Sequence, residues 1–142
     1  MPYASQVNMV AQFGEREVIA LTDRARVGLI DVGVLNDALN RASSLIDSYL
    51  SDRFGAPLTS TPVEIIDACC DIARYKLCGS DALGSDEIRN RYKDALKLLQ
   101  MVRDRELNIG LTAAGAAIVE TAGVRFTSRA RAFTPDGLLG RI

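Results

Sequence analysis

The chain has 142 residues, of which 48% are hydrophobic and 25% are charged, and its formal net charge is −1. This composition is typical of a soluble globular protein, and no stretch approaches the roughly 18 apolar residues of a membrane-spanning helix. A chain of this length buries about two-thirds of its unfolded surface on folding, so we expect one domain that needs neither a metal nor a disulfide to fold.

Apolar residues recur at helical spacing through most of the first 108 positions. Two short helices are predicted, one ending before Gly14 and one ending before Asp23. A longer helix is predicted to begin at Asp31, which is a typical N-cap residue, and to end at Gly55 and Pro57. Its core-facing residues are expected to be Leu35, Ala38, Leu39, Ala42, Leu45, Ile46, Tyr49 and Leu50.

A second long helix is predicted after residue 60, where Thr61 and Glu64 have the spacing of a capping box and Pro62 would occupy the first helical position. The segment continues to Gly79. Apolar residues cover so wide an arc of it that it should be the most buried element. Its polar stripe consists of Glu64, Asp67, Asp71 and Arg74.

The last long helix is predicted to open at Ser85 or Asp86 and to end near Asn108–Gly110. One side of it is apolar and the other is basic and polar. The apolar side consists of Ile88, Tyr92, Ala95, Leu96, Leu99 and Val102. The predicted fold class is therefore mainly α, a small bundle of about five helices.

The pattern changes after Gly110, where a segment rich in Ala, Gly and Thr precedes Val124–Phe133, in which side-chain character alternates. Alternation at period two is typical of an extended segment or a short β-strand, which needs a partner's sheet edge or groove to complete its hydrogen bonds. We divide the chain into a helical domain, residues 1–110, with net charge −3, and an extended docking arm, residues 111–142, with net charge +2. The expected partner-binding residues of the arm are Val124, Arg125, Phe126, Arg129, Arg131, Phe133, Leu138 and Leu139.

The mixture of aromatic and arginine residues in the arm has two interpretations. Single-stranded nucleic acid stacks its bases on aromatic rings between basic side chains. Aromatic and arginine side chains also dominate the hot spots of protein interfaces. We favour protein docking, because two phenylalanines and three arginines are few for a nucleic-acid groove.

Catalytic and metal-binding motifs are scarce. The chain has no histidine, which removes Ser-His-Asp and Cys-His catalysis. Residues 79–85 have the glycine spacing of a phosphate-binding loop, but Ser85 stands where such a loop requires lysine. Asp67 and Asp71 are spaced to share one helical face, which permits a divalent-cation or acid–base site, but we favour an ion pair of Asp71 with Arg74. We therefore predict no enzymatic activity, no cofactor and no metal.

The three cysteines, Cys69, Cys70 and Cys78, lie in one apolar helical segment. This arrangement suits buried structural thiols in a reducing compartment better than a disulfide framework. The first six residues lack the basic region and apolar run of a secretory signal, so we expect synthesis in the cytoplasm.

Several short motifs, taken in order and spacing, resemble the small head–tail neck proteins of Mu-like phages and prophages, long catalogued as proteins of unknown function. The resemblance spans nearly the whole chain. Its carriers are Tyr3–Ser5, Phe13–Glu15, Leu21–Asp23, Ala42–Leu50, Arg53–Leu58, Asp71–Tyr75, Arg91–Leu96 and Arg131–Gly140.

The resemblance implies a helical adaptor that forms a ring below the phage portal, extends the DNA channel and receives the next neck or tail component. The implied partners are further copies of the chain, in a ring expected to be dodecameric like the portal, the portal protein, and a neck or tail-completion protein. DNA would only pass through the channel, and no membrane is involved. The expected location is the neck of the virion.

A small helical nucleic-acid-binding regulator is the alternative, with Arg89, Arg91, Lys93 and Lys97 on a recognition helix. A solvated helix face explains these four residues equally well and is the interpretation we prefer. Binding to phosphates requires a dense stripe of basic residues, which a nearly neutral chain does not supply. An enzyme is the third and least favoured class.

Overall fold

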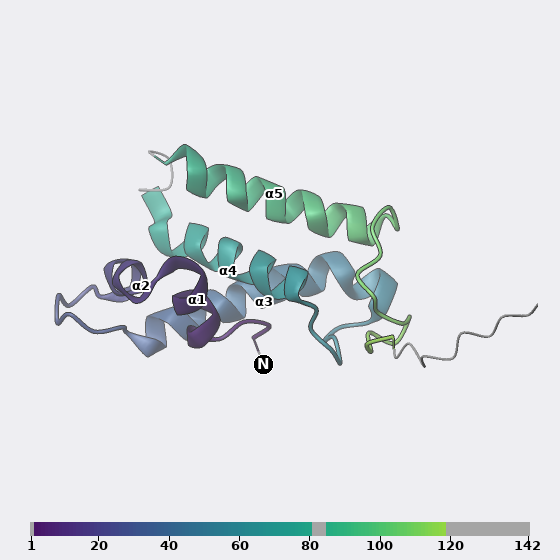
Figure 1. Ribbon diagram of the computed structural model, residues 1–142, viewed down its shortest axis with the longest axis horizontal. Coiled ribbons are helices and arrows are strands. Elements are labelled where there is room, and N and C mark those ends of the chain that lie inside the picture. Colours follow the sequence, from purple (N-terminus) through teal and green to yellow (C-terminus); the bar gives the residue numbers. More distant parts are fainter. Residues whose placement is uncertain (1, 81–84, 119–142) are drawn as a thin grey trace, which may run out of the picture.

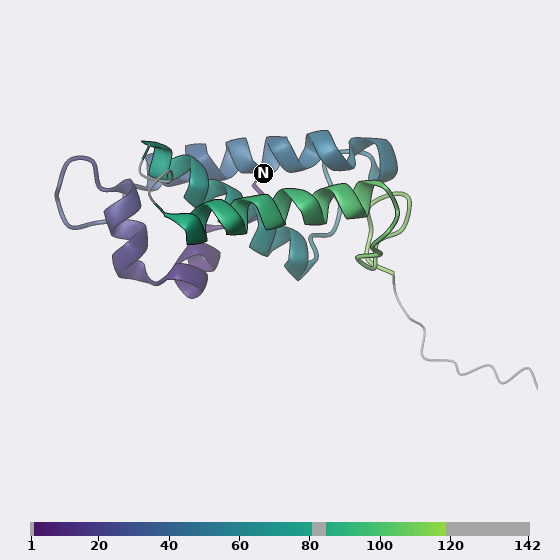
Figure 2. The same cartoon turned by 90° about the horizontal axis from the view of Figure 1, so that it is seen from above.

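The computed structural model describes residues 2–80 and 85–118, which contain five α-helices. They are α1 (Gln6–Phe13), α2 (Glu15–Thr22), α3 (Val32–Phe54), α4 (Val63–Cys78) and α5 (Asp86–Arg103). Figures 1 and 2 show the three long helices α3, α4 and α5 side by side, with α1 and α2 together near one end. The predicted mainly α fold of five helices is confirmed.

The core lies between the three long helices. Six of the eight residues predicted to form the core face of α3 are buried, and Leu45 and Tyr49 are half-buried. Helix α4 contacts each of the other four helices, as its wide apolar arc predicted. Its buried residues are Ile65, Ala68, Cys69, Cys70, Ile72, Ala73 and Arg74.

Helix caps confirm three of the predicted ends. The carboxylate of Asp31 accepts a hydrogen bond from the Val34 N–H at 3.1 Å, and the hydroxyl of Ser85 accepts one from the Ile88 N–H at 3.5 Å. Gly55 ends α3 with a φ of 71°, in the left-handed region that glycine adopts without steric cost. Local cap chemistry therefore sets both ends of α3 and the start of α5.

The start of α4 differs from the prediction. Pro62 is the N-cap with a ψ of 156°, the helix begins at Val63, and no side chain caps it. The φ of proline suits both a helix and extended backbone, so it does not decide between them. Because Pro62 is extended here, Glu64 is the second helical residue, one position short of where a capping box requires it.

The end of α5 also differs, because the helix stops at Arg103 and not near residue 108. Arg105 has a φ of 65°, its N–H bonds to the Val102 carbonyl, and the Glu106 N–H bonds to the Met101 carbonyl at 2.9 Å. This pair of bonds is a Schellman motif, which usually places glycine in the left-handed position. Because arginine and not glycine occupies that position, the end of the helix could not be predicted from the residue type.

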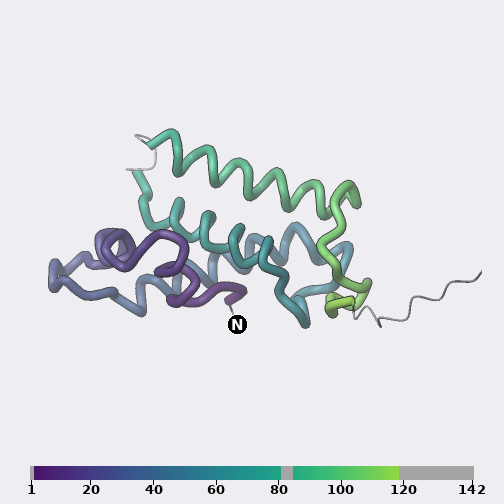
Figure 3. The backbone as a smooth tube through the Cα atoms, viewed as in Figure 1, coloured from purple at the N-terminus to yellow at the C-terminus, as the bar shows by residue number. Residues whose placement is uncertain are grey.

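Both ends of the described chain are fixed to the connection between α3 and α4. The Leu58 N–H donates to the Tyr3 hydroxyl at 3.0 Å, and that hydroxyl also donates to Asp47. On the other side, the Ser60 N–H donates to the Gly115 carbonyl at 3.0 Å. Figure 3 shows the chain around residue 115 beside this connection. A side chain at Gly115 would meet Leu58 at 3.3 Å, so the approach is close.

Candidate docking surfaces

The predicted partner-binding residues of the arm, Val124 to Leu139, all lie outside the described residues. The first part of the predicted arm, residues 111–118, is described and lies against the helical body. A β-bridge joins Leu111 to Ala117, and Leu111 is buried. The division of the chain at residue 110 stays a prediction.

A partly buried cluster of charged and aromatic side chains joins α1, α2, α4 and α5. The guanidinium of Arg74 lies over the Phe13 ring, 4.5 Å from its centre, and its Nε donates to Glu17 at 2.7 Å. Arg91 lies over the same ring at 5.3 Å, and its Nε is 3.1 Å from Asp71 Oδ1. The predicted Asp71–Arg74 ion pair is therefore wrong. Tertiary packing turns Arg74 toward Glu17 of α2 and Glu87 of α5, whereas Asp71 faces Arg91 of α5.

Asp71 is the most confined carboxylate of this cluster. Burial raises its pKa, and the positive charge of Arg91 opposes that rise. Its Oδ1 is buried and contacts Arg91 without accepting a hydrogen bond from it. No group of three or more Cys, Asp or Glu residues within 2–80 and 85–118 is arranged to hold a metal ion. Among these residues, no third ligand joins Asp67 and Asp71 in a cation site.

The thiols of Cys69 and Cys70 are buried in the core. Ser43 lies 3.6 Å from the sulfur of Cys69, and burial raises the pKa of Cys70 to about 12. A thiol with so high a pKa carries almost no thiolate at neutral pH and is a poor nucleophile. Both residues therefore have the structural character that the sequence predicted for the cysteines, and Cys78 is half-buried.

The basic face of α5 is partly engaged by the protein itself. Arg91 pairs with Asp71, and Arg89 pairs with Asp86 one turn earlier. Lys93 and Lys97 remain exposed on the surface. Two lysines one turn apart are too few to form the stripe of cations that phosphate binding requires, and this favours a solvated face over a recognition helix.

A groove of about 220 Å³ lies between α4 and α5. We call it the acid-rimmed groove. Carboxylates of Glu64, Asp67, Asp71 and Asp94 stand around it, and Ala68, Ala95 and Leu98 supply its apolar lining. Because Ala68 and Ala95 are buried, they form the floor. The groove combines an apolar floor with negative charge, which suits an apolar and basic segment.

The connection between α2 and α3, residues 23–31, presents apolar side chains to solvent at one end of the molecule. Figure 1 shows it projecting beyond the helices. Val27 and Leu29 are each 68% exposed. The sequence analysis did not identify this α2–α3 loop as a candidate contact surface. The signal was present, because Val27 and Leu29 flank a glycine in a segment that begins and ends with aspartate, which is typical of an exposed turn.

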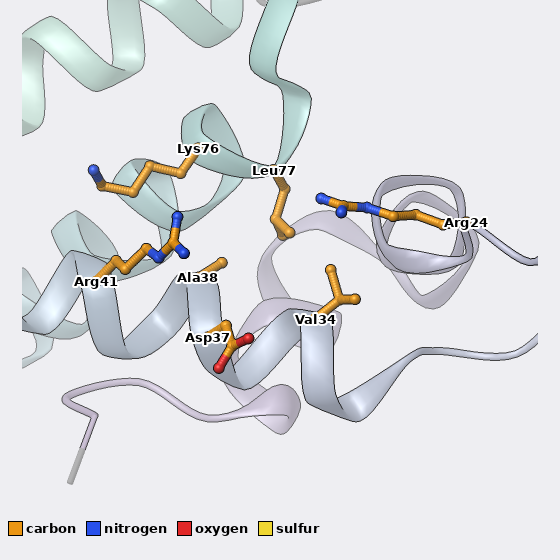
Figure 4. A pocket seen from close by; sticks show the side chains of 7 residues that line it. All are labelled: Arg24, Val34, Asp37, Ala38, Arg41, Lys76 and Leu77. Atoms are coloured by element: carbon orange, nitrogen blue, oxygen red, sulfur yellow. The ribbon is translucent and has the colours of Figure 1, made fainter.

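A positively charged cleft of about 190 Å³ adjoins the base of this loop and is lined by Arg24, Arg41 and Lys76. In Figure 4 the guanidinium of Arg24 points toward Leu77, the guanidinium of Arg41 points toward α4, and Asp37 points away from both. None of the three cations forms an ion pair with a described residue. The loop end of the body is thus locally basic, whereas the groove side is acidic.

Comparison with known proteins identifies the family. Residues 3–128 match the family described as "Bacteriophage Mu, Gp36". The chain belongs to this family. It is 31% identical to "Gene product J" of Escherichia phage Mu over 121 residues, which cover 84% of each chain. It is 28% identical to "Mu-like prophage FluMu protein gp36" of Haemophilus influenzae over 128 residues, which cover 85% of this chain and 89% of that protein.

The predicted resemblance to proteins of Mu-like phages is therefore confirmed. The family match includes all five helices, the α2–α3 loop and the acid-rimmed groove, and it ends within the predicted arm, before Arg129. Among the described residues, none of the helices is both long enough and apolar enough to cross a bilayer.

Proposed function

We propose that the chain is a structural protein of the phage particle, a head–tail adaptor that forms a ring in the neck. In this role the helical bodies pack side by side, and the arm from about Val124 onward inserts into the portal protein or a neighbouring neck protein. The ring is expected to be dodecameric to match the portal. Its other contact would be the next neck or tail-completion protein, and DNA would pass through its centre.

Membership of a phage Mu family is the first support for this role, because it makes a function in the phage life cycle the expected one. The second is the closure of the body by its own residues. Tyr3 and Gly115 both hydrogen-bond to the α3–α4 connection, which ties the two ends of the described chain to one place on the helical body.

The observation that carries the proposal is the composition of the segment after this closed body. The 24 residues from 119 to 142 contain four arginines and two phenylalanines, against two acidic residues. Such a segment has the composition of an interface anchor. A rigid block that carries a separate anchor is a form suited to joining large assemblies.

Deletion of residues 124–142 tests the proposal in the phage that encodes the chain. Helicity and the melting temperature of the purified protein should change little, because the five described helices already bury a core against one another. Electron microscopy of lysates should show complete heads and tails that are not joined. Normal infectious particles from the truncated gene would refute the proposal.

A point variant separates the chemistry of the arm from its length. Phe126→Ala with Phe133→Ala should reduce particle joining strongly. The matched control is Thr127→Ala with Thr134→Ala, which alters the adjacent positions and should leave joining intact. Equal titres for the two double variants would contradict the assignment of the phenylalanines as anchors.

A further inference from the structure

The α2–α3 loop is a preformed protrusion. The carboxylate of Asp23 accepts hydrogen bonds from the N–H groups of Val27 at 2.9 Å and Gly28 at 2.6 Å, and these bonds lower its pKa. Gly28 has a φ of 83°, which favours glycine at the turn. At the far end, the Asp31 N–H donates to the buried hydroxyl of Thr22 at 3.2 Å. A loop held in this way loses little conformational entropy when a partner covers it.

The acidic and basic side chains of the loop differ in what they contact. The carboxylates of Asp23 and Asp31 are occupied by backbone N–H groups of the loop and of α3. The side chains of Arg24 and Arg26 are exposed and form no ion pair with any described residue. Because the guanidinium of Arg24 points back toward Leu77 (Figure 4), the surface that a partner meets is the apolar pair Val27 and Leu29 with Arg26 beside it.

The acid-rimmed groove has the complementary character on another side of the body. Glu64, Asp67 and Asp94 stand at its rim and form no ion pair with any described residue. Its floor is apolar, so burial of two aliphatic side chains there is favourable. The groove and the loop thus match in shape, since one is concave and the other projects, and in charge.

We propose that the α2–α3 loop of one copy inserts into the acid-rimmed groove of a second copy. Val27 and Leu29 contact the floor, and Arg26 faces the carboxylates of Asp67 and Asp94. Because the two surfaces are different parts of the chain, the contact is head-to-tail and leaves a free loop and a free groove at the ends. Such a contact builds a ring when the rotation from one copy to the next closes, as the proposed ring requires. This inference rests on the proposed ring and names the surfaces that build it.

Two double variants test the contact with the full-length chain. Val27→Ser with Leu29→Ser removes the apolar tip, and Asp67→Lys with Asp94→Lys reverses the charge of the rim. None of the four residues is buried in the core, so folding should be preserved. The control is Asp52→Lys with Glu106→Lys, which makes the same change in net charge at exposed acidic residues outside the groove.

Sedimentation velocity and NMR with labelled protein then report association. The wild type and the control should associate as concentration rises to about 1 mM, more weakly when NaCl is raised to about 0.5 M. Amide signals of residues 24–29 and 64–71 should shift together. Each of the two interface variants alone should remain monomeric. Their equimolar mixture should form a dimer that does not grow further, because only one intact loop and one intact groove are present.

Three results would overturn the inference: a wild type that stays monomeric at about 1 mM, interface variants that associate like the control, or a mixture that stays monomeric. Shifts of the Arg24 and Arg26 signals that appear only on addition of a short DNA duplex would also overturn it, in favour of a phosphate contact. None of these results bears on particle joining by the arm, which the truncation tests separately.

Discussion

Replacing Arg74 by methionine tests whether one buried guanidinium holds α1 and α2 on the bundle. The Arg74 side chain is only 9% exposed, and it pairs with Glu17 while covering the Phe13 ring. Methionine keeps most of the aliphatic stem and removes the charge. Loss of one partner from a buried ion pair costs about 3 to 5 kcal/mol, and loss of an aromatic contact to the cation costs about 0.5 to 1 kcal/mol. Because Glu17 is 35% exposed and regains water, we expect a total loss of about 2 to 3 kcal/mol.

Urea denaturation followed by circular dichroism measures this loss. With a denaturant dependence of about 1.5 kcal/mol per molar, the midpoint should fall by about 1.3 to 2 M. Arg41→Met is the matched control, because Arg41 is exposed and forms no ion pair with a described residue, and it should change the stability by less than about 0.5 kcal/mol. A double-mutant cycle with Glu17→Gln should give a coupling of about 1 to 2 kcal/mol. Equal midpoints for the Arg74 and Arg41 variants, or strict additivity in the cycle, would refute the reasoning.

Two further predictions concern the core and the N-terminal attachment. Leu99→Ala should cost about 2 to 5 kcal/mol in the same assay, because Leu99 is fully buried. Leu96→Ala should cost about half as much, because Leu96 is half-buried. Equal losses for the two variants would contradict this difference in burial. Tyr3→Phe should cost about 1 to 3 kcal/mol, because it leaves the buried Leu58 N–H without an acceptor. Burial and the Asp47 contact raise the pKa of Tyr3 from 10.0 to about 12, so the folded state favours the neutral phenol. Its contribution is complete below about pH 10 and is lost as pH rises from 10 to 12. The stability of Tyr3→Phe should therefore fall less over that interval than that of the wild type.

Local signals in the sequence predicted most of the helical fold. Asp31 and Gly55 bound α3 correctly because a carboxylate cap and a left-handed glycine act within one turn of the helix. The two misplaced bounds have equally local causes that the residue type does not reveal. Pro62 has a φ that suits helix and extended chain alike, and Arg105 occupies a left-handed position that usually belongs to glycine.

The candidate docking surfaces were harder to predict, because they depend on which helices become neighbours. The Asp71–Arg74 pair was expected from their spacing on one helix, yet each side chain pairs with a residue distant in sequence. The acid-rimmed groove exists only because α4 and α5 bring Asp67 and Asp94 to the same hollow. No pattern within a single segment contains that information, whereas the composition of the arm can be read directly from the chain.

Different groups determine the shape of the α2–α3 loop and the surface that it presents to a partner. Main-chain hydrogen bonds to Asp23, and the backbone freedom of Gly28, hold the turn. The side chains of Val27 and Leu29 contribute little to it, because both are largely exposed to solvent. Evolution can therefore exchange the two tip residues without disturbing the scaffold. Under the proposed contact between loop and groove, phages that share this body would be able to keep their subunits from mixing during co-infection by changing two side chains and the facing wall of the groove.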